Sequence, residues 1–310
     1  MISRRNIRVK VMQTLYTLYS MGGDVKPEEV QKILTKKIEQ SRELFTYLIY
    51  FITEVARYAE TDSLHKASKH LPTIDDLNIN TRIAGNEWLW KILEDPGFKK
   101  EVRGFSLTNI LDHALLKRIY QQLAESAEYK EYIALVTREK RAERDILEFI
   151  FNDLMLPSED FITHLEEHFI HWDDDAEMMH QLVINYLQKP AGHSFTEIMS
   201  KEKWDFACGL LQTVLEKKDV CMDLIKPKLN NWDADRIAAL DLIILEMGVS
   251  EFLFFETIPT KVTINEYIDL AKEYSTVQSG QFVNGLLDNI HKELMAENKI
   301  VKKNFKDITL

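Results

Sequence analysis

The sequence is poor in cysteine, glycine and proline, and it has no long uncharged hydrophobic run. Its 310 residues include 2 cysteines, 10 glycines and 7 prolines. Two cysteines cannot supply a disulfide framework or a cysteine zinc site, and they fit a reducing cytoplasm. The scarcity of glycine and proline argues against disorder, collagen and turn-rich all-β folds. The most apolar stretch, residues 238–255, is interrupted by Asp241, Glu246 and Glu251, so we expect no membrane span.

Basic residues are also in the minority. The chain has 39 Lys and Arg against 50 Asp and Glu, which gives a net charge of −11. Such a chain cannot attract a polyanion through its overall charge, so any nucleic-acid site must be a local basic patch. The N-terminus has no apolar segment followed by a small-residue cleavage site, so we expect no secretory signal and a cytoplasmic protein.

The familiar catalytic motifs are missing. The sequence contains no phosphate-binding glycine loop, no dinucleotide fingerprint and no nucleophile elbow. We therefore expect no enzyme and no cofactor. One alternative is a zinc peptidase, because His164-Leu-Glu-Glu-His168 has the order of inverted zinc peptidases and His171 follows. A five-residue match in an acidic helix is weak, and no carboxylate ligand can be assigned, so we expect no metal site.

Apolar residues recur at steps of three and four over most of the chain, and strand-type alternation is almost absent. This pattern predicts an all-α fold. Residues 44–58 are apolar on most sides, so we expect this helix at the centre of a core. The clearest boundary is Lys189-Pro-Ala-Gly192, and a capping-box spacing at Thr263–Glu266 predicts a helix start there.

The first 23 residues contain four cations and no acid. These cations can bind RNA phosphates: Arg4, Arg5, Arg8 and Lys10. They are followed by Gln13 and two tyrosines, which can hydrogen-bond to bases or stack on them. The alternative is a solvated helix start.

A second candidate site is the segment from Ser279 to Gly285. Gly285 lies within a strong helical pattern, where it costs about 1 kcal/mol relative to Ala, so we expect close approach of a backbone or a ligand. Phe282 either packs in the core or offers its ring to a base. Gln281 and Asn284 can supply hydrogen bonds, and Ser279 could do so or cap the helix.

A third basic stretch, Arg138 to Arg144, is interleaved with acidic residues. Mixed charges at helical spacing favour a solvated face over a nucleic-acid patch.

The two ends of the chain together resemble the NusB family of transcription antitermination factors. The resemblance covers residues 4–20 and about 200–295. Its motifs are Arg4-Arg-Asn-Ile-Arg8, Val11-Met-Gln-Thr-Leu-Tyr16, Arg236-Ile-Ala-Ala-Leu-Asp241, Ile243-Ile-Leu245, Val262-Thr-Ile-Asn-Glu266, Asp269-Leu-Ala-Lys272 and Phe282-Val-Asn-Gly285. The resemblance implies NusB-like helical bundles: two packed three-helix bundles, with an additional helical region here.

The resemblance also implies a function. Family members bind the boxA element of ribosomal RNA leader transcripts together with NusE, a small-subunit ribosomal protein. The complex joins RNA polymerase and promotes processive transcription. By position, the expected RNA-binding residues are Arg4, Arg5, Arg8, Lys10, Gln13, Gln281, Phe282 and Asn284, and the expected partner-binding residues are Asp241, Glu246 and Glu251.

The chain departs from the family pattern in two ways. The pattern prefers Arg where this chain has Leu242 and Glu246, and Tyr where it has Ser250. Typical members also lack the long middle. The expected domains are an N-terminal arm with helices that pack on the family core (1–60), a helical insertion (61–195), the C-terminal core (196–295) and a basic tail (296–310). The alternative function is a helical interaction scaffold that has lost RNA binding, favoured by the net charge, Glu246 and the insertion.

Overall fold

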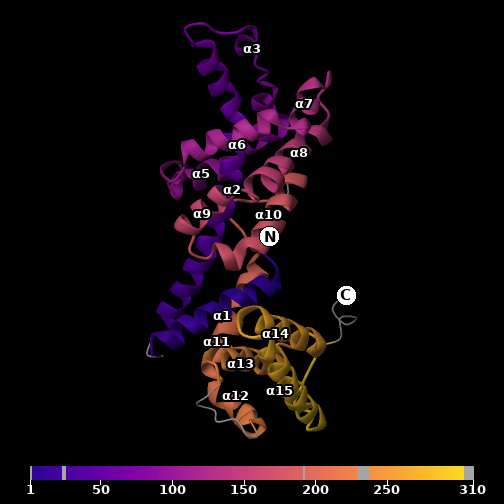
Figure 1. Cartoon of the computed structure of the whole chain (residues 1–310). Coiled ribbons are helices and arrows are strands. Elements are labelled where there is room, and N and C mark those ends of the chain that lie inside the picture. Colours follow the sequence, from indigo (N-terminus) through magenta and orange to yellow (C-terminus); the bar gives the residue numbers. More distant parts are fainter. Residues whose placement is uncertain (1, 23–25, 191–192, 230–236, 304–310) are drawn as a thin grey trace. The chain divides into compact units, whose positions relative to one another are not determined.

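The computed structural model describes residues 2–22, 26–190, 193–229 and 237–303, and in these ranges the chain is helical without a strand (Figure 1). The all-α prediction is confirmed. No helix in the described ranges is both long and apolar enough to cross a membrane. Residue 236, which carries part of a quoted motif, lies outside the described residues.

The contacts divide the chain into two units. Unit 1 comprises residues 38–198, and unit 2 comprises residues 2–37 together with the chain from residue 199. The first boundary falls within helix α2 (Pro27–Ala67), so this helix contributes to both units. It differs from the expected boundary near residue 60, because aromatic side chains of α2 pack inside unit 1: Phe45 on Phe195, and Phe51 on Phe161 with ring centroids 4.8 Å apart.

Unit 1 is built around the apolar face of α2. Leu48, Ile49, Phe51 and Ile52 are fully buried, which confirms the expectation that residues 44–58 lie in a core. The surrounding helices are α3 (Ile74–Leu77), α4 (Glu87–Glu94), α5 (Pro96–Gly104), α6 (His113–Glu125), α7 (Ala127–Ala134), α8 (Lys140–Phe149), α9 (Glu159–His168) and α10 (Trp172–Gln188), with a π-helical turn at Ile150–Met155.

The three arginines of the stretch 138–144 are paired with acids inside unit 1. Arg138 contacts the buried carboxylate of Glu143, and Arg141 and Arg144 both contact Asp145. Glu143 also accepts a hydrogen bond from Tyr132. This pairing agrees with a salt-bridged helix face rather than a patch for nucleic acid.

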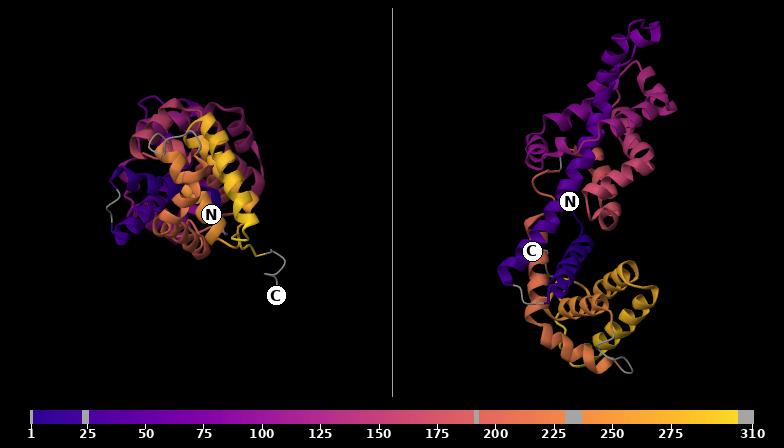
Figure 2. Two further views of the ribbon diagram at one scale, coloured as in Figure 1. Left: turned by 90° about the horizontal axis from the view of Figure 1, so that it is seen from below. Right: turned by 60° about the vertical axis from the view of Figure 1, so that its left-hand side comes forward.

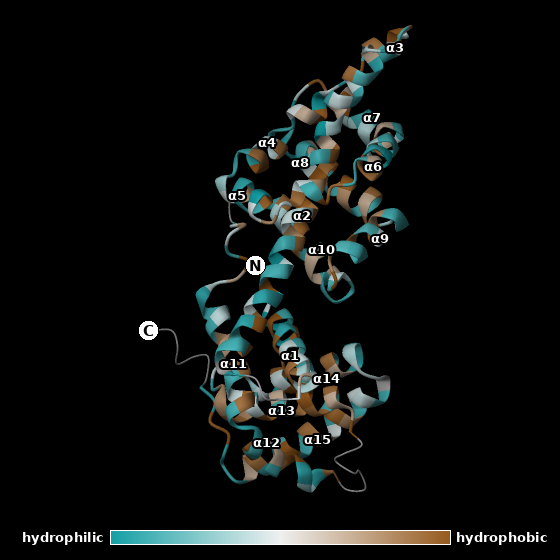
Figure 3. Ribbon diagram, turned by 90° about the vertical axis from the view of Figure 1, so that its left-hand side faces the viewer, coloured by the Kyte–Doolittle hydropathy of each residue, from teal (hydrophilic) through white to brown (hydrophobic). Residues whose placement is uncertain are grey.

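Unit 2 contains α1 (Arg4–Ser20), the start of α2, α11 (Lys201–Glu216), α12 (Lys218–Ile225), α13 (Ala239–Phe254), α14 (Thr260–Tyr274) and α15 (Val277–Ala296). Helix α13 is the centre of this unit: α1 and α11 pack on it, and α14 and α15 pack on it and on each other (Figure 2). Apolar residues run along its whole length (Figure 3). Because α13 is enclosed by helices, its buried residues extend around the helix instead of forming a single stripe.

Two helix starts in unit 2 differ from the sequence expectations. Helix α14 begins at Thr260, and Thr263 is a buried residue inside it that donates to Glu251, so the capping-box assignment is wrong. Helix α15 is capped by Thr276, whose side chain accepts a hydrogen bond from the Ser279 amide. In α14 the Thr263 hydroxyl donates to the buried Glu251 instead of capping the helix. In α15 the cap comes from Thr276, three residues before Ser279.

Candidate functional site

A buried ion pair fastens α1 to α13. Arg8 donates through Nε and Nη2 to the two carboxylate oxygens of Glu251, each at 2.9 Å, and the side chains are 2% and 0% exposed. Burial lowers the pKa of Arg8, but the hydrogen bond to Glu251 and the charges of Tyr267, Glu251 and Glu266 together outweigh burial, so the pKa is raised. Glu251 also accepts from Thr263 and Tyr267. Its oxygens are therefore fully used within unit 2.

This pair corrects two of the expected site residues. A guanidinium that is 2% exposed cannot reach an RNA phosphate, and a carboxylate with no exposed surface cannot meet a partner protein. Lys10 is also buried, at 1% exposure, so its ammonium is not part of an RNA surface. These cations follow one another on a helix that packs on α11 and α13, and the sequence shows the charges without showing this packing.

Arg4 and Arg5 lie at the start of α1 and remain partly exposed, at 38% and 39%. Arg4 pairs with Glu202 of α11 at 2.6 Å. Arg5 pairs with Glu273 of α14 at 2.8 Å and lies 3.6 Å from Asp269. Exposed pairs of this kind are worth about 0–1 kcal/mol, so a phosphate can compete with the carboxylates for these guanidinium groups.

The start of α15 presents an open polar face. Gln281, Asn284 and Gly285 are exposed, and Phe282 is half-buried rather than enclosed in the core. A Cβ added to Gly285 would meet nothing within 4 Å. The expected close approach of another backbone at Gly285 is therefore absent among the described residues, and the surface there is free for a ligand.

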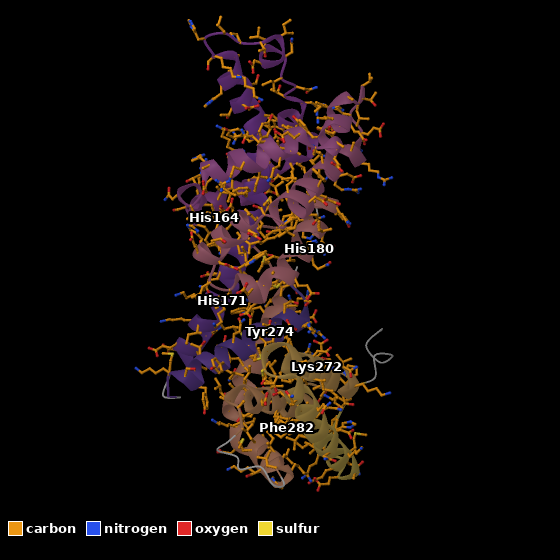
Figure 4. All side chains as sticks on the ribbon, viewed as in Figure 1. His164, His171, His180, Lys272, Tyr274 and Phe282 are labelled. Atoms are coloured by element: carbon orange, nitrogen blue, oxygen red, sulfur yellow. The ribbon has the colours of Figure 1, made fainter. Side chains whose placement is uncertain are left out.

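The two expected parts of the site meet at one end of α14. Arg5 contacts Glu273 in the last turn of α14, and α15 begins at Val277, three residues after α14 ends. Lys272 joins them, because its side-chain stem lies against Gly280 at the start of α15. Figure 4 labels Lys272 and Tyr274 on α14 and Phe282 on α15.

Lys272 is a further candidate site residue, which the sequence analysis did not select. Its side chain is 57% exposed, and its ammonium lies 3.9 Å from Asp269. The Asp269-Leu-Ala-Lys272 motif contained this lysine, but its nearness to α15 depends on the short connection between α14 and α15. Gln13, on α1, is half-buried, so it is less accessible than the exposed Lys272, Gln281 and Asn284.

Asp241 and Glu246 are both buried on α13. Asp241 accepts a hydrogen bond from the Ser279 hydroxyl at 2.8 Å, which links α13 to the start of α15. This contact gives Asp241 a structural role in place of the expected surface contact. Glu246 is 6% exposed, and burial raises its pKa to about 7. It is therefore not on an open protein-binding surface, although it lines a pocket described below.

The two histidines of the zinc-peptidase motif lie in unit 1. The buried His164 hydrogen-bonds with Tyr47, and burial lowers its pKa. His168 hydrogen-bonds through Nδ1 with the carbonyl of His164 at 2.9 Å. Within the described ranges, no three His, Cys, Asp or Glu side chains form a group that could hold a metal ion. His164 thus serves as a satisfied core residue.

Comparison with known proteins places part of the chain in a family. The model of the NusB family matches residues 165–292. A transcription antitermination protein NusB of Desulfatibacillum aliphaticivorans is 40% identical over 103 residues, which are 33% of this chain and 72% of that protein. Proteins of the same name from Salinibacter ruber and Listeria monocytogenes are 40% and 38% identical, over 61% and 75% of their lengths and 32% and 31% of this chain.

No solved structure matches the chain. The matched region covers about three quarters of the Desulfatibacillum and Listeria proteins and somewhat less of the Salinibacter protein. The chain belongs to the NusB family.

Proposed function

We propose that this protein is a non-catalytic transcription antitermination factor that binds single-stranded, boxA-type leader RNA. It acts together with NusE and within the RNA polymerase antitermination complex. The names of its relatives support the antitermination function. The meeting of Arg5, Lys272 and the exposed start of α15 at one end of α14 is the observation that carries the RNA proposal.

The mechanism combines charge and stacking. Arg4, Arg5 and Lys272 are the partly exposed cations that neutralise phosphates, and Phe282 offers a ring face on which a base stacks. Gln281 and Asn284 hydrogen-bond to base edges. Because the total charge is −11, this patch attracts RNA only at short range. NusE then contributes affinity that the small basic patch lacks.

Salt dependence tests this proposal. Three phosphate contacts on a single strand predict a slope of about −2 in a plot of log affinity against log salt concentration. The burial of Arg8 and Lys10 is the reason for counting three contacts and excluding these two. The double variant Arg4→Ala, Arg5→Ala should flatten the slope to about −0.7, measured by fluorescence anisotropy with a labelled boxA-type RNA in the presence of NusE.

The matched control is Arg141→Ala, which removes a more exposed arginine from unit 1. It should leave affinity and slope unchanged. An unchanged slope in the double variant would remove the start of α1 from the mechanism.

A helical interaction scaffold is the second candidate function. The observation that favours it is the pairing of Arg4, Arg5 and Arg8 with carboxylates of unit 2. A scaffold would bind NusE without RNA and would show no preference for boxA-type RNA over a scrambled RNA of equal length. Separate and combined binding measurements with NusE and the two RNAs distinguish the two functions.

A further inference from the structure

A pocket of about 930 Å³ opens within unit 2 between α1, α2, α11 and α13. Its apolar lining includes Leu15 and Leu18 of α1, Leu211 and Leu215 of α11, and Ile243 of α13. Ligand pockets in proteins span roughly 300–1,000 Å³ and are mostly apolar with a few placed polar groups. None of the residues of the proposed RNA surface lines this pocket.

Glu246 is the polar group that the pocket encloses. Its side chain is 6% exposed, and its Oε1 atom has no hydrogen-bond partner among the described residues. Burial raises its pKa, and Lys218 lowers it by a smaller amount. A buried carboxylate oxygen without a donor costs stability, so a group that donates a hydrogen bond to it gains binding energy.

The charged residues of the lining indicate whether the bound group is a cation or an anion. Glu28 of α2 and Glu216 of α11 line it in addition to Glu246, and Lys218 of α12 is the basic residue in the lining. Tyr19 and Cys208 also line the pocket, and Cys221 is buried near Glu246; burial raises the pKa of both thiols, so the two cysteines are uncharged. Three acids against one base disfavour an anion such as a nucleic-acid phosphate and favour a cation.

We propose that this pocket binds an arginine or lysine side chain of a partner protein, with the cationic group donating to Glu246. The pocket is larger than one side chain needs, and Tyr19 and Leu215 leave apolar surface exposed in its lining. Apolar residues next to the cation in the same partner segment would cover that surface. A peptide segment with a cation between apolar residues therefore matches the pocket better than a free amine, which leaves this apolar surface uncovered.

This proposal goes beyond the proposed RNA function and does not depend on it. The lining of the pocket and the proposed RNA surface share no residue, so the two proposals can be tested separately.

Peptide binding to the full-length protein tests the proposal. The probes are the acetylated, amidated peptide Leu-Arg-Leu and the same peptide with citrulline, which is neutral and nearly isosteric with arginine. Binding is followed by NMR of the methyl groups of Leu211 and Ile243, with peptide added to about 10 mM, a range that detects millimolar affinity. We expect saturable shifts of these methyls and about tenfold tighter binding of the arginine peptide at about pH 8.

The variant Glu246→Gln should remove the difference between the two peptides, and Glu216→Gln, which makes the same charge change at an exposed position of the same pocket, should keep most of it. The unmodified protein gives a second reading, because protonation of Glu246 below its pKa of about 7 should weaken the arginine peptide and leave the citrulline peptide unaffected. Equal binding of the two peptides, shifts confined to other methyls, or no saturable shift would overturn the proposal. RNA affinity should be unaltered in Glu246→Gln, which separates this result from the test of the RNA surface.

Discussion

Arg8 and Glu251 are 243 residues apart in the sequence, and they form a two-bond ion pair with almost no exposed surface. Removal of one partner leaves an uncompensated buried charge, which costs about 3–5 kcal/mol. We therefore expect Arg8→Ala to lower the free energy of unfolding by about that amount, measured by urea denaturation. Arg4→Ala, which breaks an exposed pair, should change it by less than about 1 kcal/mol. Equal losses of unfolding free energy in the two variants would contradict the stabilising role of the buried Arg8–Glu251 pair.

We expect substitution by alanine to have opposite effects on stability at Gly248 of α13 and at Gly285 of α15. A Cβ added at Gly248 would lie 2.9 Å from Leu287 Cδ2, so Gly248→Ala should destabilise unit 2 by about 1–3 kcal/mol through overpacking. Gly285→Ala meets open space and should stabilise α15 by about 1 kcal/mol. Thermal unfolding followed by circular dichroism compares the two variants. Destabilisation by Gly285→Ala would contradict the open space at this position.

Phe282→Ala separates stacking from packing. Since the ring is half-buried, its loss should cost less stability than the about 3–5 kcal/mol of a fully buried Phe. Loss of a stacked base should weaken RNA binding by about 1–3 kcal/mol. Affinity for boxA-type RNA is measured at a temperature where both proteins are folded. Normal affinity in a destabilised variant would assign Phe282 to the core alone.

Glu246 should make the stability of unit 2 depend on pH. Its folded pKa of about 7 lies above the ordinary value of 4.5, so the folded state holds more protons than the unfolded state between these values. The stabilising contribution of protonated Glu246 to the free energy of unfolding is fully present below about pH 4.5 and is lost as the pH rises through 7. Glu246→Gln should therefore be more stable than the parent above pH 7, by at most about 3 kcal/mol.

Urea denaturation across this pH range measures the effect, with Glu216→Gln as the exposed control. Parallel pH profiles of Glu246→Gln and the parent protein would contradict the proposed ionisation.

Sequence reasoning predicted the helical class because apolar periodicity is local, and it predicted a core position for residues 44–58 because they are apolar on most sides. The roles of individual charges were harder to predict. Arg4, Arg5, Arg8 and Lys10 are indistinguishable in sequence, yet two are partly exposed and two are buried. Burial depends on which face of α1 meets α11 and α13, and the acceptor of Arg8 comes from the far end of the chain. Long-range pairing of this kind leaves no local signal in the sequence.

The discontinuity of unit 2 has a consequence for how the chain matures on the ribosome. All of residues 38–198 are translated before the first residue of α11, so the helices of unit 1 can assemble while α1 still lacks the segments that bury it. Until α11 and α13 emerge, α1 lacks the two helices on which it packs, and Arg8 lacks the carboxylate of Glu251. The N-terminal segment therefore keeps apolar surface uncovered while the whole of unit 1 is synthesised.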